Sequence, residues 1–90
     1  MTVNELLNHG FNAVSLPEPE REITGVYIGD LLSWVMGRAK ASDAWITIMS
    51  NSNIVAVASL ADVATILLAE GVELDDNVKQ LAEAKGVNVL

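Results

Sequence analysis

The sequence predicts an α/β fold, a single compact domain whose mainly parallel β-sheet is flanked by helices around a βαβαβ core. Ninety residues are the size of one such domain. The apolar runs 44–49 and 64–69 have the continuous apolar character of strands that are buried in a parallel sheet. Segments with helical character, 53–61 and 75–85, follow these runs, and a return through a helix makes neighbouring strands parallel.

The N-terminal part is expected to contain a short helix, two strands and a loop. Thr2 followed by Glu5 is a capping-box pattern, and Gly10 is a natural end for the helix. We expect strands near 11–15 and 23–28. The residues between them are rich in proline and glutamate, which indicates a solvated loop.

The next helix is expected to begin after Asp30, which stands where an N-cap residue belongs. Its apolar residues repeat at helical spacing along one side: Leu31, Leu32, Val35, Met36 and Ala39. Trp34 lies outside this stripe. Two interpretations of Trp34 stay open, a partly buried core residue or an anchor in an interface, where aromatic side chains are enriched.

The two later helices differ in polarity. Helix 75–85, which Gly86 ends before a last strand at 87–90, has one apolar stripe and one charged face. Helix 53–61 has a core stripe and an opposite side that is also nearly apolar. The core stripe is Ile54, Val57, Ala58 and Ala61, and the opposite side is Val55, Ala56, Ser59 and Leu60.

A second copy of the chain is expected to cover helix 53–61. A helix that is apolar all round is buried all round, and a chain of this size offers no further layer of its own. A twofold homodimer is the commonest arrangement that supplies the cover. We expect its interface to include Trp34, Val55, Ala56, Ser59 and Leu60.

Composition argues against several classes of protein. The net charge is -7, and the five basic residues form no cluster, which disfavours nucleic-acid binding. The absence of cysteine excludes disulfides and thiolate metal sites and fits a cytoplasmic protein. The longest apolar run, 54–69, contains Asp62 and is shorter than the roughly 20 residues that a membrane span needs. No membrane segment and no cofactor are expected.

Two segments are candidates for ligand binding. The glycines of the 24–29 segment fit neither a P-loop nor a dinucleotide fingerprint, and Asp30 would occupy the place of a phosphate at the helix start. The polar run 50–53 follows a parallel strand, where open α/β sheets bind ligands, although ordinary helix capping by Asn51 or Ser52 is the competing interpretation. The candidate residues are Thr24, Gly25, Gly29, Ser50, Asn51, Ser52 and Asn53. No nucleophile with a base and no metal-ligand set is visible, so no catalytic activity is expected.

The order of these segments resembles the DRTGG domain. The resemblance runs from about Val3 to Leu90 through REITGVYIGDLLSWVM, AWITI, NIVAVASLADVATILLAEG and AKGVNVL, and it is nearest to small stand-alone members from anaerobic bacteria and archaea. It implies an α/β domain that, in phosphotransacetylases and regulatory pyrophosphatases, contributes to subunit contacts rather than to chemistry. Two features depart from the pattern: Val26 follows Gly25 where the signature has a second glycine, and Glu20 with Arg21 matches the signature's start only loosely.

The resemblance also implies partners. Stand-alone relatives are often labelled as serine kinases of the phosphocarrier protein HPr, a label that does not carry over because this chain lacks a P-loop. Some lie near genes for iron-only hydrogenases, which implies a protein partner in hydrogenase or energy metabolism. Family members commonly continue past the segment matching GVNVL, so residues 1–90 are expected to form one DRTGG-like domain, either minimal or trimmed at its C-terminus.

Two functions follow from the residues and the resemblance together. The first is a non-catalytic regulatory or interaction module that forms a homodimer through helix 53–61. The alternative is a domain that senses a nucleotide or a phosphorylated metabolite at the 50–53 and 24–29 segments.

Overall fold

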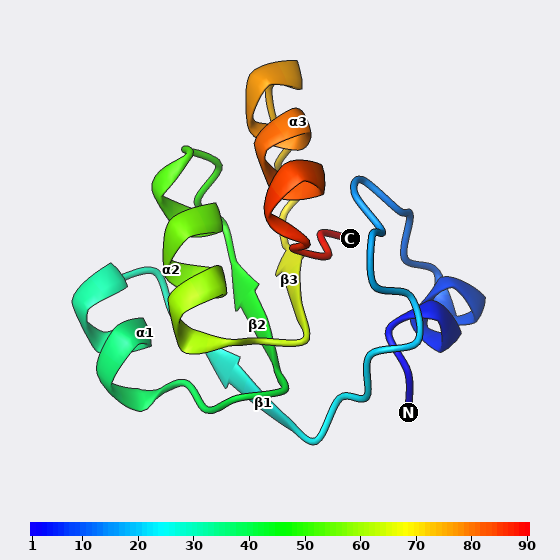
Figure 1. Ribbon diagram of the computed structural model, residues 1–90, viewed down its shortest axis with the longest axis horizontal. Helices are drawn as coiled ribbons and strands as arrows, with labels where there is room; N and C mark the ends of the chain where they lie inside the picture. Colours follow the sequence, from blue (N-terminus) through cyan, green and yellow to red (C-terminus); the bar gives the residue numbers. More distant parts are fainter.

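Strands and helices alternate along the chain from residue 25 onward (Figure 1). The computed structural model describes all 90 residues. Its elements are the 3₁₀ helix η1 (Asn4–His9), β1 (Gly25–Ile28), α1 (Leu32–Arg38), β2 (Asp43–Thr47), α2 (Asn53–Ala61), β3 (Thr65–Leu68) and α3 (Asp76–Lys85). The strands form a parallel sheet in the order β1-β2-β3. The predicted α/β fold with a parallel sheet and flanking helices is therefore confirmed.

The sheet continues beyond β3 through short stretches of backbone. The amide of Ile66 donates to the carbonyl of Asn88 at 2.8 Å, which places the C-terminal residues parallel to β3. Ser15 then pairs with Val89 in the antiparallel direction. The strands predicted near 11–15 and at 87–90 are thus represented by single bridges rather than by full strands.

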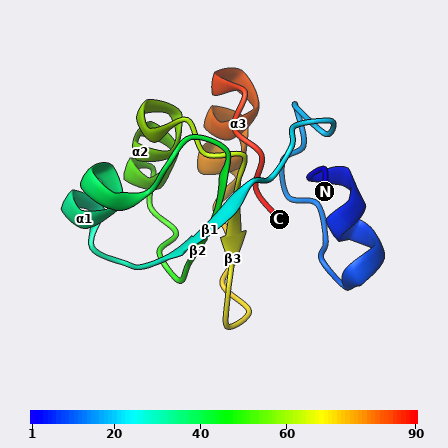
Figure 2. The ribbon, with the colours of Figure 1, turned by 90° about the horizontal axis from the view of Figure 1, so that it is seen from below.

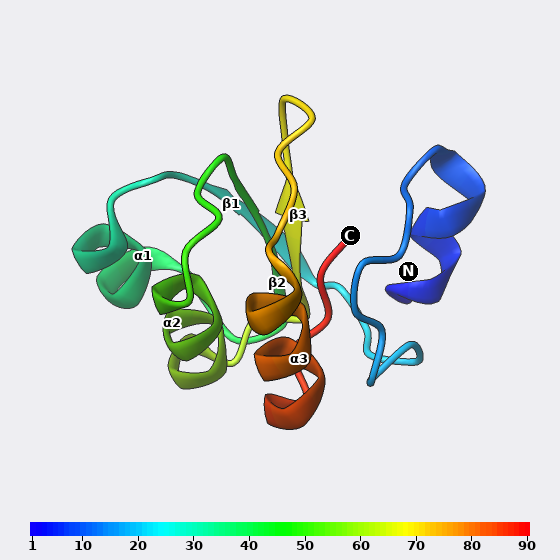
Figure 3. The same cartoon turned by 90° about the horizontal axis from the view of Figure 1, so that it is seen from above.

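The three α-helices lie side by side on one face of the sheet, with α2 between α1 and α3 (Figures 2 and 3). Right-handed crossovers that always advance in the same direction place all their helices on the same face. The main core between helices and sheet contains Val35, Trp45, Ile54, Val55, Ala58, Val63, Ile66, Leu74, Val78, Ala82, Val87 and Val89.

The position of α2 corrects the prediction for helix 53–61. Val55 is completely buried within its own chain, so its predicted place on the outer side of the helix is wrong. The sheet and the two neighbouring helices cover most of α2, and this cover explains its apolar sequence without a second copy. The residues that stay exposed are Asn53, Ala56, Ser59 and Leu60, the last with an exposed fraction of 74%.

The opposite face of the sheet is only half covered. The N-terminal segment lies beside the C-terminal residues (Figure 2). It packs in a second apolar cluster formed by Val3, Ala44, Ala64, Leu67 and Leu90, with Leu6, Leu7, Phe11, Leu16, Ile23 and Ile46 at its margin. On β1, by contrast, Val26 and Ile28 are 62% and 71% exposed, and Ile48 after β2 is 50% exposed. A bare apolar surface therefore remains where β1 and β2 face away from the helices.

Most helices begin and end with the capping residues that the sequence predicts. The capping box is confirmed, because the amide of Thr2 donates to Glu5 and the amide of Glu5 donates to the Thr2 hydroxyl. Gly10 and Gly86 end their helices with φ of 91° and 71°, in the left-handed region that favours glycine. At α2 the side chain of Asn51, rather than that of Ser52, accepts a hydrogen bond, from the amide of Asn53 at 2.9 Å.

The N-cap predicted at Asp30 is wrong. Leu31 occupies that position at the start of α1. The Asp30 carboxylate instead accepts hydrogen bonds from the Thr47 hydroxyl and the Ile48 amide. None of the helices is at once long and apolar enough to cross a bilayer.

Candidate functional site

The predicted ligand residues lie at opposite ends of the sheet. Residues 25–28 form β1 itself, so the 24–29 segment is not a turn. Thr24 and Gly25 stand at the amino end of the strand, whereas Gly29 and the 50–53 run stand at the carboxyl ends of β1 and β2. At about 3.3 Å per residue the two ends of the segment are roughly 13 Å or more apart. A single small-molecule site therefore cannot contain both predicted segments.

Internal hydrogen bonds engage several polar groups at the carboxyl end, although the side chains of Ser50, Ser52 and Asn53 form none within the chain. The Asn51 side chain accepts the amide of Asn53 at 2.9 Å, and the Gly29 carbonyl accepts the indole N–H of Trp45, also at 2.9 Å. Hydrogen bonds from the Ile48 amide, and then from the Thr47 hydroxyl, hold the pKa of the Asp30 carboxyl below its usual value. Neither of the two pockets of the molecule includes residues 50–53.

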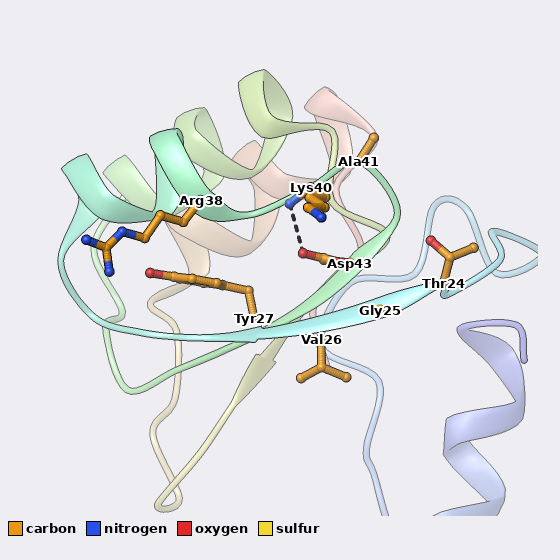
Figure 4. Close-up of a pocket in the computed structure, with 8 residues that line it drawn as sticks. All are labelled: Thr24, Gly25, Val26, Tyr27, Arg38, Lys40, Ala41 and Asp43. Atoms are coloured by element: carbon orange, nitrogen blue, oxygen red, sulfur yellow. Dashed lines mark hydrogen bonds between the residues drawn. The ribbon is translucent and has the colours of Figure 1, made fainter.

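A pocket of about 380 Å³ lies at the amino end of β1, between this strand and the end of α1 (Figure 4). Its lining residues are Thr24, Gly25, Val26, Tyr27, Arg38, Lys40, Ala41 and Asp43. Sequence reasoning identified only the first two of them. Val26 and Tyr27 follow in β1, whereas Arg38 ends α1, Lys40 and Ala41 lie in the loop after it, and Asp43 begins β2, so only the fold brings these four residues to Thr24 and Gly25. The sequence offered one signal for this pocket: two of its five basic residues, Arg38 and Lys40, stand only two positions apart.

Asp43 occupies the inner wall of the pocket. It is only 7% exposed, and its Oδ2 atom accepts the amide of Lys40 at 2.8 Å. Its Oδ1 atom lies against Gly25, where a Cβ atom would come within 2.5 Å of that oxygen. Gly25 is therefore required for close approach of the carboxylate rather than for a phosphate loop.

Arg38 and Trp34 form a stacked pair on α1. The guanidinium carbon of Arg38 lies 4.0 Å from the centre of the Trp34 ring. Trp34 is 52% exposed and does not belong to the core, so the partly buried core interpretation is not supported. Its role as an interface anchor stays a prediction.

A second pocket of about 410 Å³ lies at the carboxyl end of β3, between the N-terminal segment and the turn after this strand. Its lining residues are Gly10, Phe11, Asn12, Val14, Leu68, Gly71, Val72, Glu73 and Leu90. This lining is largely apolar and contains a single ionisable side chain. Nowhere in the chain do three or more histidine, aspartate or glutamate side chains converge as a metal site would require.

The fold and the first pocket define a small α/β domain whose three-stranded parallel sheet is covered by helices on one face. Comparisons of this chain with protein-family models, curated proteins and solved structures find no match.

Proposed function

We propose that this protein is a non-catalytic interaction module that acts as a homodimer, and that the bare sheet face is its dimer surface. We define the bare sheet face as the exposed Val26, Ile28 and Ile48 together with the partly buried Ile46, which borders the second apolar cluster. The observation that carries the proposal is the exposure of Val26 and Ile28, at 62% and 71%, on a strand of a parallel sheet. Parallel sheets are normally covered on both faces, so we expect a partner to cover the exposed half of this sheet face.

The register of the strands makes this surface continuous and uncharged. Val26 stands opposite Ala44 and Ile28 stands opposite Ile46, and Ile46 in turn stands opposite Leu67 of β3. These two rows contain no charged side chain. Because the chain carries a net charge of -7, two copies meet with least repulsion through a surface without acids.

A second copy is the occupant that the geometry favours. β1 is the edge strand of the sheet, and its outer edge has no partner strand. A twofold axis close to β1 would bring the same apolar rows of both copies together, as an isologous contact requires. A stable interface takes about 800 Å² from each partner, roughly a sixth of the 5028 Å² surface of this chain.

The surface of α2 supports a dimer less well. Of its exposed residues only Leu60 is large and apolar, and Trp34 on α1 is stacked by Arg38. The DRTGG resemblance stays a prediction, and it adds the expectation of a domain that makes subunit contacts. The partner in hydrogenase or energy metabolism likewise stays an expectation from that resemblance.

Sedimentation velocity at micromolar concentration tests the proposal with two matched variants. Ile28→Asp and Leu60→Asp each place a charge at a position of nearly equal exposure, 71% and 74%. We expect the wild type and Leu60→Asp to sediment as dimers and Ile28→Asp as a folded monomer. A monomeric wild type would overturn the homodimer. Dissociation by Leu60→Asp alone would move the interface to α2.

A further inference from the structure

The pocket beside β1 contains a carboxylate oxygen that belongs to a buried residue and has no hydrogen-bond donor within the chain. The Oδ2 atom of Asp43 accepts the Lys40 amide, but its Oδ1 atom accepts from no residue. Every fully buried polar side-chain atom of the protein has a hydrogen-bond partner, so this oxygen must open into the pocket. Asp43 as a whole is only 7% exposed, so a donor reaches this oxygen from the pocket. A donor from outside the chain would fit there.

Two unpaired cations stand at the same pocket. Two of the five basic residues form ion pairs with aspartates, and the other three are Arg38, Lys40 and Lys85. Arg38 and Lys40 both line the pocket (Figure 4). In a chain with a net charge of -7, this local excess of positive charge favours an anionic group.

The stacking of Arg38 on Trp34 orients the guanidinium so that it can bind an anionic group. A guanidinium that lies over an aromatic ring keeps its N–H donors in its own plane, where they can reach an anion in pairs. Figure 4 shows the Tyr27 side chain extending toward Arg38 on the same side of β1. Its hydroxyl forms no hydrogen bond with another residue and is a further polar group available to a ligand.

We infer that this pocket binds a small molecule with two features, an anionic group that meets Arg38 and Lys40 and an N–H donor that meets the Oδ1 atom of Asp43. A volume of about 380 Å³ is near the lower end of the range for ligand sites. That size suits a free amino acid or a mononucleotide, and both classes carry the two features. A dinucleotide cofactor is too large for it.

The site is independent of the proposed dimer surface. Side chains alternate along β1, so Tyr27 faces the helices and the pocket while Val26 and Ile28 face the opposite side. Figure 4 shows Val26 pointing away from Arg38 and Lys40. Occupation of the pocket therefore leaves the bare sheet face free, and either proposal can fail without the other.

A ¹H–¹⁵N NMR titration of the wild-type protein tests the inference with AMP and L-alanine as separate probes. Inorganic phosphate and propionate are the matched controls, because each lacks the N–H donor of its partner probe. We expect shifts at the amides of residues 24–27 and 38–43, and binding at least tenfold tighter for AMP than for phosphate or for alanine than for propionate. Such tighter binding by either probe supports the inference and identifies the ligand class, whereas equal affinity of each probe and its control would overturn it.

Two charge-matched variants distinguish specific binding in the pocket from nonspecific electrostatic attraction to the protein. Lys40→Met and Lys85→Met each remove one exposed positive charge, but only Lys40 lines the pocket. We expect Lys40→Met to weaken binding about tenfold and Lys85→Met to change it less than about twofold. Asp43→Asn, with its folding checked in the same spectrum, should abolish the preference for AMP over phosphate. Absence of shifts with both probes at about 10 mM, or equal effects of the two lysine variants, would overturn the inference.

Discussion

The Asp30 carboxylate accepts a hydrogen bond from the Thr47 hydroxyl at 2.8 Å, across the carboxyl ends of β1 and β2. The same Oδ1 atom accepts the amide of Ile48 at 3.1 Å, and the Thr47 hydroxyl oxygen accepts the amide of Met49 at 3.2 Å. These bonds begin where the ladder between the two strands ends. Asp30 thus holds together the start of the loop that leads from β2 to α2.

Acid is expected to weaken this link. Both hydrogen bonds favour the ionised form, so the pKa of Asp30 lies below its ordinary value of 3.8. Its contribution to the free energy of unfolding is complete above that value and is lost as pH falls through the lowered pKa. Wild type should therefore exceed Asp30→Asn in stability by more at about pH 6 than at about pH 2.5, measured by urea unfolding. An equal difference at both pH values would contradict the link.

Features that depend on local sequence were predictable. The capping box at Thr2 and Glu5 and the glycine ends at Gly10 and Gly86 involve neighbours in the chain, and the structure contains them. The parallel sheet was also predictable, because the clear helix at 75–85 implies a crossover between parallel strands, and this requirement decides that the ambiguous segment 53–61 is a helix too.

Features that depend on the layer arrangement were not predictable. Nothing in the sequence states that all three α-helices share one face, and that arrangement alone buries Val55 and leaves Val26 and Ile28 bare. Asp30 has the residue type and the position of an N-cap, but the hydroxyl of Thr47, distant in sequence, competes for its carboxylate. The pocket likewise depends on Asp43 and Gly25 approaching each other across two parallel strands.

Asn88 is expected to be a main structural support that no sequence motif indicates. It is 2% exposed, and its amide group donates to the carbonyls of Glu18 and Ala64 at 2.7 and 3.0 Å while its Oδ1 atom accepts the Glu18 amide at 2.9 Å. Asn88→Leu keeps the branching at Cγ but removes the polar atoms and leaves these groups unpaired, so we expect a loss of about 3 kcal/mol. Thermal unfolding should shift down by roughly 10 °C or more.

Asn77→Leu is the matched control for this variant. Asn77 is exposed on α3 and its side chain forms no hydrogen bond with another residue, so the same substitution should change stability by less than about 0.5 kcal/mol. Similar losses in both variants would show that the Asn88 side chain does not hold the loop at Glu18 to the sheet.

The two glycines Gly25 and Gly37 are expected to respond oppositely to alanine. A Cβ atom at Gly25 would come within 2.5 Å of the Asp43 carboxylate, whereas a Cβ atom at Gly37 in α1 would meet nothing within 4 Å. Gly25→Ala should displace Asp43 from the Lys40 amide and cost about 2 kcal/mol. Gly37→Ala should stabilise α1 by up to about 1 kcal/mol. Urea unfolding of both variants measures the difference, and a neutral Gly25→Ala would show that Asp43 moves aside freely.

Val55 and Val26 undergo the same change to alanine in opposite environments. Val55 is completely buried against the sheet and the neighbouring helices, so Val55→Ala should lower the free energy of unfolding by about 2 kcal/mol. Val26 is 62% exposed in the single chain, and Val26→Ala should cost less than about 0.5 kcal/mol at concentrations where the chain is monomeric.

The same two variants should also differ in their effect on dimerisation, which appears at higher protein concentrations. Val26→Ala should weaken dimerisation and Val55→Ala should leave it unchanged, because only Val26 lies on the bare sheet face. Urea unfolding at several protein concentrations measures both effects. If Val26→Ala lowers stability by the same amount at every concentration, Val26 makes no contact between copies.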